Sequence, residues 1–193
     1  FSYTWDMVLP NYDKIFKLGL RGIIQQAQDR LKEIEADLTL EAGDYLEQKR
    51  FLEAAIISLE ATITFAKRYA ALAREKAKAE TRPDEKKRLE KLAEICENVP
   101  ESPPRTMHEA IQSFFFIHLI TGFIELPSVG CGVRLDQILY PYYRKDIDEG
   151  RLSKEEALNL IESIWIKFEE MGFIHPPRLF GSAGGGLAWQ NVT

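Results

Sequence analysis

The sequence is poor in cysteine and histidine, the residues that build disulfide frameworks and many metal sites. It contains two cysteines, Cys96 and Cys131, and three histidines among 193 residues. Two thiols are too few for a disulfide scaffold or a four-thiolate zinc site, and they fit a reducing cytoplasm. His108 and His118 are ten residues apart on one expected helix, on nearly opposite faces, so they are not expected to share a metal. We therefore expect no metal site in this chain.

An excess of basic residues and a long apolar run are also absent. Lys and Arg number 25 against 30 Asp and Glu, for a net charge of −5, so nothing draws the chain to nucleic acid. The longest apolar run, Phe114 to Ile124, is interrupted by polar residues and is too short to cross a bilayer. With 45% hydrophobic and 28% charged residues the composition is that of a globular protein. Nucleic acid and membrane are therefore not expected partners.

Helical patterns are what the sequence does contain. Apolar residues recur at helical spacing from Asp13 to about Ala36, and Gly19 and Gly22 interrupt them where close packing against a neighbour is expected. A longer helix is expected from Gly43 to Glu80. Asp84 is expected to cap a third helix that reaches about residue 98. The expected inward stripe of the long helix consists of Phe51, Ala55, Leu59, Ile63, Ala66, Ala70 and Ala73.

Two capping boxes predict the starts of two further helices. Thr106-Met107-His108-Glu109 opens a helix to about Ile124, which is nearly all apolar and should lie within a large core. Ser153-Lys154-Glu155-Glu156 opens a helix to about Met171, after a turn at Asp148-Glu149-Gly150. The apolar side of this last helix is expected to carry Leu158, Ile161, Trp165 and Phe168.

The last part of the sequence changes character. Prolines and glycines fill the segment after Gly172, and Leu187 to Thr193 then predicts the first residues of a strand. Helices this apolar need partners that the chain does not obviously contain, and the sequence starts with Phe1. We expect both ends to be cut from something longer.

Three stretches of the sequence resemble the glycyl radical enzymes, the pyruvate formate-lyase-like superfamily. One is Leu9-Pro10-Asn11-Tyr12-Asp13-Lys14 followed by Gly19-Leu20-Arg21-Gly22-Ile23. The most specific runs from His108-Glu109-Ala110-Ile111-Gln112 to Arg134-Leu135-Asp136-Gln137 and Tyr140-Pro141-Tyr142-Tyr143. The third runs from Gly181-Ser182-Ala183 to Trp189-Gln190-Asn191-Val192-Thr193. Order and spacing agree along nearly the whole chain.

The resemblance implies a fold and a kind of chemistry. Residues 1–193 would be part of one pyruvate formate-lyase-like domain, mainly α, forming the helical outer layer and the first strand of a ten-stranded α/β barrel. An activating enzyme that uses S-adenosylmethionine and an iron–sulfur cluster would install a radical on a glycine. That radical would pass to a cysteine, which abstracts hydrogen from a small-molecule substrate. The apolar helices would help to exclude water and oxygen, and the full-length protein is expected to be a homodimer or larger assembly.

The resemblance places both radical residues outside this chain. Cys131 lies before the family's cysteine loop, and Val133 stands where many members have a glutamate. The glycine run at Gly184 is not the radical loop, and a phosphate-binding loop there would need a following Lys-Ser/Thr. No catalytic residue is therefore expected here.

Several residues are nevertheless expected near the substrate or its loops. The resemblance implies that Tyr3, Cys131, Trp189 and Gln190 face the substrate, with core packing as the alternative for Tyr3 and Trp189. The signature residues Arg134, Asp136 and Gln137 are expected to have a structural role. Arg134 and Asp136 would form charge-assisted bonds with each other or with backbone, and so brace the preceding loop.

The departures from the family pattern point to a substrate. Asp6-Met7 stands where diol dehydratases have a Gly-His pair, and the segment 125–133 has few polar side chains. A less polar pocket suits an apolar substrate, so we expect radical C–C or C–X chemistry, with hydrocarbon addition to fumarate as in benzylsuccinate and alkylsuccinate synthases. An arylacetate decarboxylase, a dehydratase or a formate acetyltransferase remains the alternative. A non-enzymatic alternative is a stand-alone helical interaction module built on the Gly43 to Glu80 helix.

Overall fold

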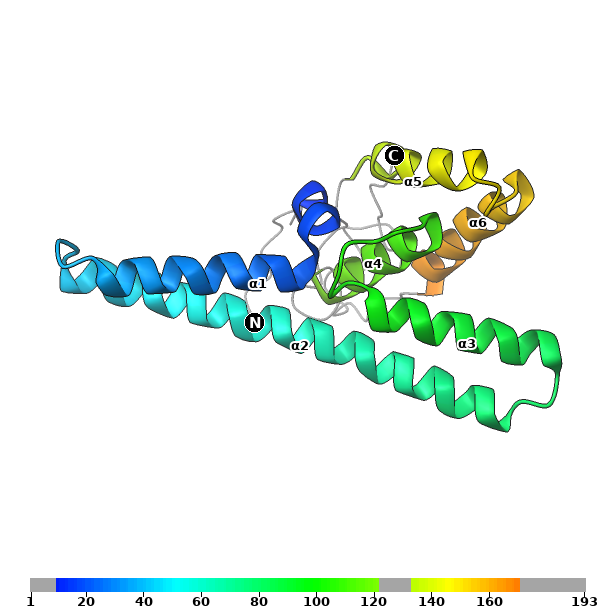
Figure 1. Cartoon of the computed structure of the whole chain (residues 1–193), viewed down its shortest axis with the longest axis horizontal. Helices are drawn as coiled ribbons and strands as arrows, with labels where there is room; N and C mark the ends of the chain where they lie inside the picture. The colour runs from blue at the N-terminus through cyan, green and yellow to red at the C-terminus, as the bar shows by residue number, and fades with distance from the viewer. Residues whose placement is uncertain (1–9, 122–132, 171–193) are drawn as a thin grey trace, which may run out of the picture. The chain divides into compact units, whose positions relative to one another are not determined.

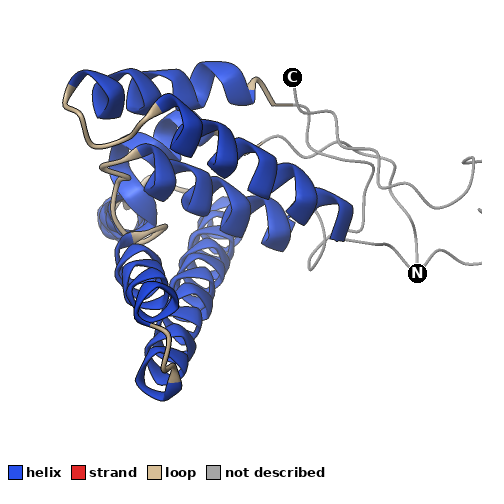
Figure 2. Cartoon of the chain, turned by 90° about the vertical axis from the view of Figure 1, so that its right-hand side faces the viewer, coloured by secondary structure: helices blue, strands red, loops and turns tan. Residues whose placement is uncertain are grey.

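The computed structural model describes residues 10–121 and 133–170, and helices are the ordered elements of both ranges (Figures 1 and 2). This confirms the mainly helical expectation. The strand expected from residue 187 onward lies outside the described residues. The helices are α1 (Tyr12–Ala36), α2 (Ala42–Ala79), α3 (Pro83–Asn98), α4 (Met107–Leu119), α5 (Leu135–Asp148) and α6 (Lys154–Glu170).

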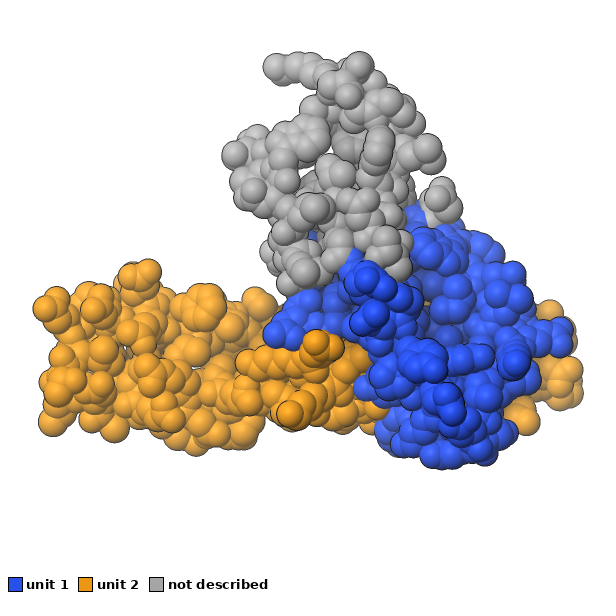
Figure 3. All heavy atoms as spheres, turned by 90° about the horizontal axis from the view of Figure 1, so that it is seen from above, with its two compact units in different colours: residues 1–12, 105–193 blue, residues 13–104 orange. Residues whose placement is uncertain are grey.

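The chain divides into two compact units, which are coloured separately in Figure 3. Residues 13–104 form the hairpin unit, which holds nearly all of α1 together with α2 and α3. Residues 1–12 and 105–193 form the signature unit, which holds α4, α5 and α6. The Arg134 to Tyr143 segment therefore belongs to the signature unit, and the long helices belong to the hairpin unit.

Helix α2 packs against α3 through a stripe of small residues. Its buried residues are Thr62, Ile63, Ala66, Ala70, Ala73 and Ala77. Alanine lets two backbones approach closely, and α3 meets the stripe with Leu89, Ala93 and Cys96, which are buried. The expected bounds of α2 are confirmed, but Phe51 does not belong to the inward stripe because 72% of it is exposed.

Helix α3 begins differently from the expectation. Arg82 is its N-cap and Pro83 occupies the first helical position, where the missing N–H of proline costs nothing. Asp84 lies in the first turn of the helix instead of capping it. Its carboxylate there interacts favourably with the positive end of the helix dipole. The predicted cap at Asp84 was therefore wrong, because the proline fixes the start two residues earlier.

Helix α1 is broken at Gly19. This residue has φ 65° and ψ 168°, and a Cβ there would lie 2.4 Å from the carbonyl oxygen of Glu101. Only glycine tolerates both conditions. The amides after the break are satisfied from outside the helix, since Leu20 N–H donates to the Pro100 carbonyl at 2.9 Å and Arg21 N–H donates to the Glu101 carbonyl at 3.0 Å.

Close packing at Gly19 was expected and is confirmed. The same expectation was wrong at Gly22, where a Cβ would meet only Leu18 of the same helix among the described residues. The Glu101 carboxylate strengthens the contact at the break, because it accepts from Arg21 Nη2 at 2.7 Å and pairs with Lys67 of α2. One loop residue thus ties α1 to α2.

The signature unit is built around α4. The predicted capping box at Ser153 has both bonds: Ser153 N–H donates to Glu156 Oε2 at 2.8 Å, and Glu156 N–H donates to Ser153 Oγ at 3.1 Å. At Thr106 the first bond is present, from Glu109 N–H to Thr106 Oγ1 at 3.2 Å, but the Glu109 carboxylate accepts from the Arg105 N–H at 2.7 Å, one residue before the N-cap. Phe114 of α4 is fully buried, and its ring lies 5.0 Å from that of Tyr12 and 6.1 Å from that of Phe168. The expected central position of α4 is therefore confirmed. Helix α4 contacts both α5 and α6.

Candidate functional site

The signature segment from Arg134 to Tyr143 forms the start of helix α5, which the sequence analysis did not assign. Pro141 lies inside this helix. It lacks the N–H that would bond to the Gln137 carbonyl, so proline normally argues against a helix. Leu135 and Leu139 are spaced by one helical turn and are both buried. That pair was the signal that could have revealed the helix.

A buried carboxylate holds α4, α5 and the following turn together. Asp146 is 3% exposed, and its Oδ2 accepts from the Met107 N–H of α4 at 2.7 Å. Its Oδ1 accepts from Arg151 Nε at 2.9 Å and from Arg151 Nη2 at 2.6 Å. The turn reverses through Gly150, which has φ 68°. Asp146 is therefore the anchor of the signature unit.

The sequence analysis missed this role of Asp146. An acidic residue in the last turn of a helix interacts unfavourably with the negative end of the helix dipole. An acidic side chain at such a position therefore suggests that a hydrogen-bond donor or a cation elsewhere binds it. Here one partner, Arg151, lies five residues ahead, and the other, Met107, lies 39 residues back. The second contact could not be read from the sequence, because it depends on how the helices pack.

Arg134 and Asp136 pair with each other at the start of α5. Arg134 Nε donates to Asp136 Oδ1 at 3.0 Å, and Arg134 Nη2 donates to Oδ2 at 2.9 Å. The Arg134 guanidinium holds the pKa of the Asp136 carboxyl below its usual value. Gln137 donates its backbone N–H to the Arg134 carbonyl at 3.1 Å, which closes the first turn. Both charged side chains are more than half exposed, so the pair adds little stability by itself.

The residues expected to face the substrate are not among the described ones. Tyr3, Cys131, Trp189 and Gln190 all lie outside 10–121 and 133–170. The segment 125–133 that Arg134 and Asp136 were expected to brace lies outside the described residues up to residue 132, and of it only Val133 is described, as buried. The substrate contacts and the bracing role therefore remain predictions.

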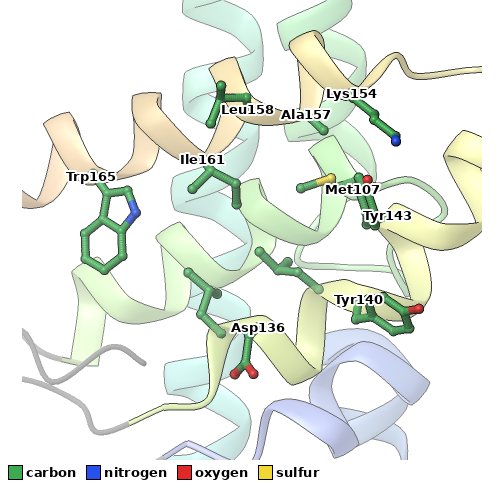
Figure 4. A pocket seen from close by; sticks show the side chains of 11 residues that line it. Met107, Asp136, Tyr140, Tyr143, Lys154, Ala157, Leu158, Ile161 and Trp165 are labelled. Atoms are coloured by element: carbon green, nitrogen blue, oxygen red, sulfur yellow. The ribbon is translucent and has the colours of Figure 1, made fainter.

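An open apolar groove of about 450 Å³ lies between α5 and α6, beside the start of α4 (Figure 4). Figure 4 shows Leu158, Ile161 and Trp165 in sequence along α6. Across the groove, Asp136, Tyr140 and Tyr143 come from the signature helix α5. The remaining lining residues are Met107, Leu135, Leu139, Lys154 and Ala157. The groove favours contact with an apolar surface, since few polar groups reach it.

The expected apolar side of α6 is split by this groove. Phe168 is buried, with its ring 5.5 Å from that of Trp165, while Leu158 is 56% exposed and Trp165 is 42% exposed. Side chains of this size are seldom left so accessible side by side unless a partner covers them. The signature helix thus contributes one wall of a surface that can bind a further polypeptide segment.

Chemically reactive clusters are not found in the described residues. Within 10–121 and 133–170 no three His, Cys, Asp or Glu side chains are placed to hold a metal ion. Burial raises the pKa of the Cys96 thiol to about 11, so it stays protonated and unreactive near neutral pH. In the same ranges no helix is long and apolar enough to span a bilayer.

Comparison with known proteins identifies the family. The family described as "Pyruvate formate lyase-like" matches residues 4–193, so the chain belongs to this family, the glycyl radical enzymes. The isethionate sulfite-lyase of Oleidesulfovibrio alaskensis is 37% identical over 185 residues, which are 95% of this chain and 22% of that protein. The trans-4-hydroxy-L-proline dehydratase of Clostridioides difficile is 37% identical over 157 residues, 81% of this chain and 20% of that protein.

A solved structure shows the same arrangement. The glycerol-bound form of the B12-independent glycerol dehydratase from Clostridium butyricum superposes with a TM-score of 0.89 at 31% identity. The alignment covers 98% of this chain and 23% of the dehydratase. The chain therefore spans about a fifth of the length of the relatives it matches, and the helices described here correspond to part of such an enzyme.

Proposed function

We propose that these residues belong to a glycyl radical lyase or dehydratase that eliminates a small leaving group from a small, hydroxyl-bearing substrate. The observation that carries this proposal is the match of nearly the whole chain to relatives named for such reactions. One is a sulfite-lyase and two are dehydratases. Their names share one net change: a C–S or C–O bond is cleaved and sulfite or water departs.

The comparisons favour this function over hydrocarbon addition to fumarate. That expectation rested on Asp6-Met7 and on the few polar side chains of 125–133. Asp6-Met7 and residues 125–132 lie outside the described residues, and the relatives at 37% identity are named for elimination reactions. A pocket that binds a hydroxylated substrate needs side chains that hydrogen-bond to the hydroxyl groups. We propose that these side chains belong to the rest of the barrel, outside the described residues.

The contribution of this chain is structural support for the radical site. A protein radical, installed by an activating enzyme that uses S-adenosylmethionine, would supply hydrogen abstraction when present. Among the residues described here, Asp146 holds the signature helix against α4 and the following turn. We place the reaction in the cytoplasm of an anaerobic cell, since oxygen destroys such radicals. The stand-alone interaction module has no comparable support, because residues 4–193 match the enzyme family.

The test is a substrate panel on the intact protein, activated under strict anaerobiosis. The panel should contain isethionate, trans-4-hydroxy-L-proline, glycerol and 1,2-propanediol, with fumarate plus toluene as the competing reaction. Release of sulfite, or loss of water to give a carbonyl or an imine-type product, is the expected result. A succinate adduct from fumarate, with no elimination from the other compounds, would establish the competing function. A glycyl radical signal in electron paramagnetic resonance confirms that each sample was active.

A further inference from the structure

We draw no further inference here: the strongest candidate, the open apolar groove between α5 and α6 beside the start of α4, carries none because nothing among residues 10–121 and 133–170 shows what covers it.

Discussion

Gly19 is the residue at which the local geometry permits the fewest substitutions. Gly19→Ala should weaken the second segment of α1, because its Cβ would meet the Glu101 carbonyl at 2.4 Å and the positive φ disfavours any side chain. We expect a local cost of about 2–4 kcal/mol. Hydrogen exchange of the peptide 20–36 in the intact protein should then accelerate by roughly 30-fold or more.

The matched control for Gly19→Ala is Gly43→Ala. Gly43 lies in the first turn of α2, and nothing stands within 4 Å of a Cβ placed there. Alanine favours a helix over glycine by up to about 1 kcal/mol, so exchange in α2 should slow slightly or stay the same. Unchanged exchange in α1 of the Gly19→Ala protein would contradict the description of the break.

Asp146 is the residue whose charge the signature unit depends on most. In Asp146→Asn one oxygen must serve both the Met107 N–H and Arg151, which now faces a neutral partner in a buried site. Breaking such a pair costs about 3 kcal/mol. We expect a lower melting temperature and faster exchange at the start of α4.

Asp148→Asn provides the comparison for Asp146→Asn. Asp148 accepts from Arg144 at 2.8 Å, but its side chain is 58% exposed, so the loss should stay below about 1 kcal/mol. Equal destabilisation by the two changes would show that Asp146 is not the anchor.

At the scale of the elements, Glu101 links α1 to α2 in a manner that depends on pH. Burial alone would raise the pKa of its carboxyl, but bonds from Lys67 and Arg21 outweigh burial and lower the pKa below 4.5. The stability that the ionised Glu101 carboxylate gives the folded state is therefore fully present above about pH 4.5. It is lost as the pH falls through the lowered pKa of Glu101 in the folded protein. Partial exposure limits it to about 1 kcal/mol.

Glu101→Gln should reproduce this loss at neutral pH. We expect the melting temperature of the variant to lie below that of the parent at pH 7 and to converge with it as the pH falls through the lowered pKa of the Glu101 carboxyl. Glu33→Gln removes an exposed pair with Arg30 three residues away and should change the melting temperature little at either pH. A constant difference between Glu101→Gln and the parent across pH would exclude the ionic contribution.

The elements that sequence reasoning found correctly have local causes. The boxes at Thr106 and Ser153 are bonds between residues three apart, so the sequence alone specifies them. Helix α5 was missed because Pro141 is a strong local argument against a helix, and packing of Leu135 and Leu139 overrides it. Phe51 was assigned to the wrong face because helical spacing alone does not show which side a neighbour covers.

At the scale of the whole molecule, family membership was readable from the sequence and the candidate groove was not. The signature residues stand at fixed spacings along the chain, so the match needs no structure. The groove depends on which faces of α5 and α6 meet around Met107, 28 residues before α5 begins. Such a contact follows from packing between distant segments. The open groove also indicates that these 193 residues, separated from the rest of the protein, lack a segment that covers their apolar surface.

The separated chain should therefore expose apolar surface. We expect the 193-residue chain to bind an environment-sensitive dye strongly and to melt with little cooperativity, because Leu158 and Trp165 line the groove and are exposed to solvent. Changing both to Gln should reduce dye binding without loss of helix signal. Leu38→Gln, 96% exposed in the loop between α1 and α2, should leave dye binding nearly unchanged. A sharp melt without dye binding would indicate an independent domain.

The break at Gly19 also has a consequence for the order of folding. The Arg21 side chain meets Glu101 across a sequence separation of 80 residues, and the freed amides at the break bond to the same loop. Closing a loop of that length is slow compared with forming a helix or a helical hairpin. We therefore expect the bend in α1 to form only after α2 and α3 have come together. Until then, the start of α1 has no fixed direction, and the bend marks the completion of the hairpin unit.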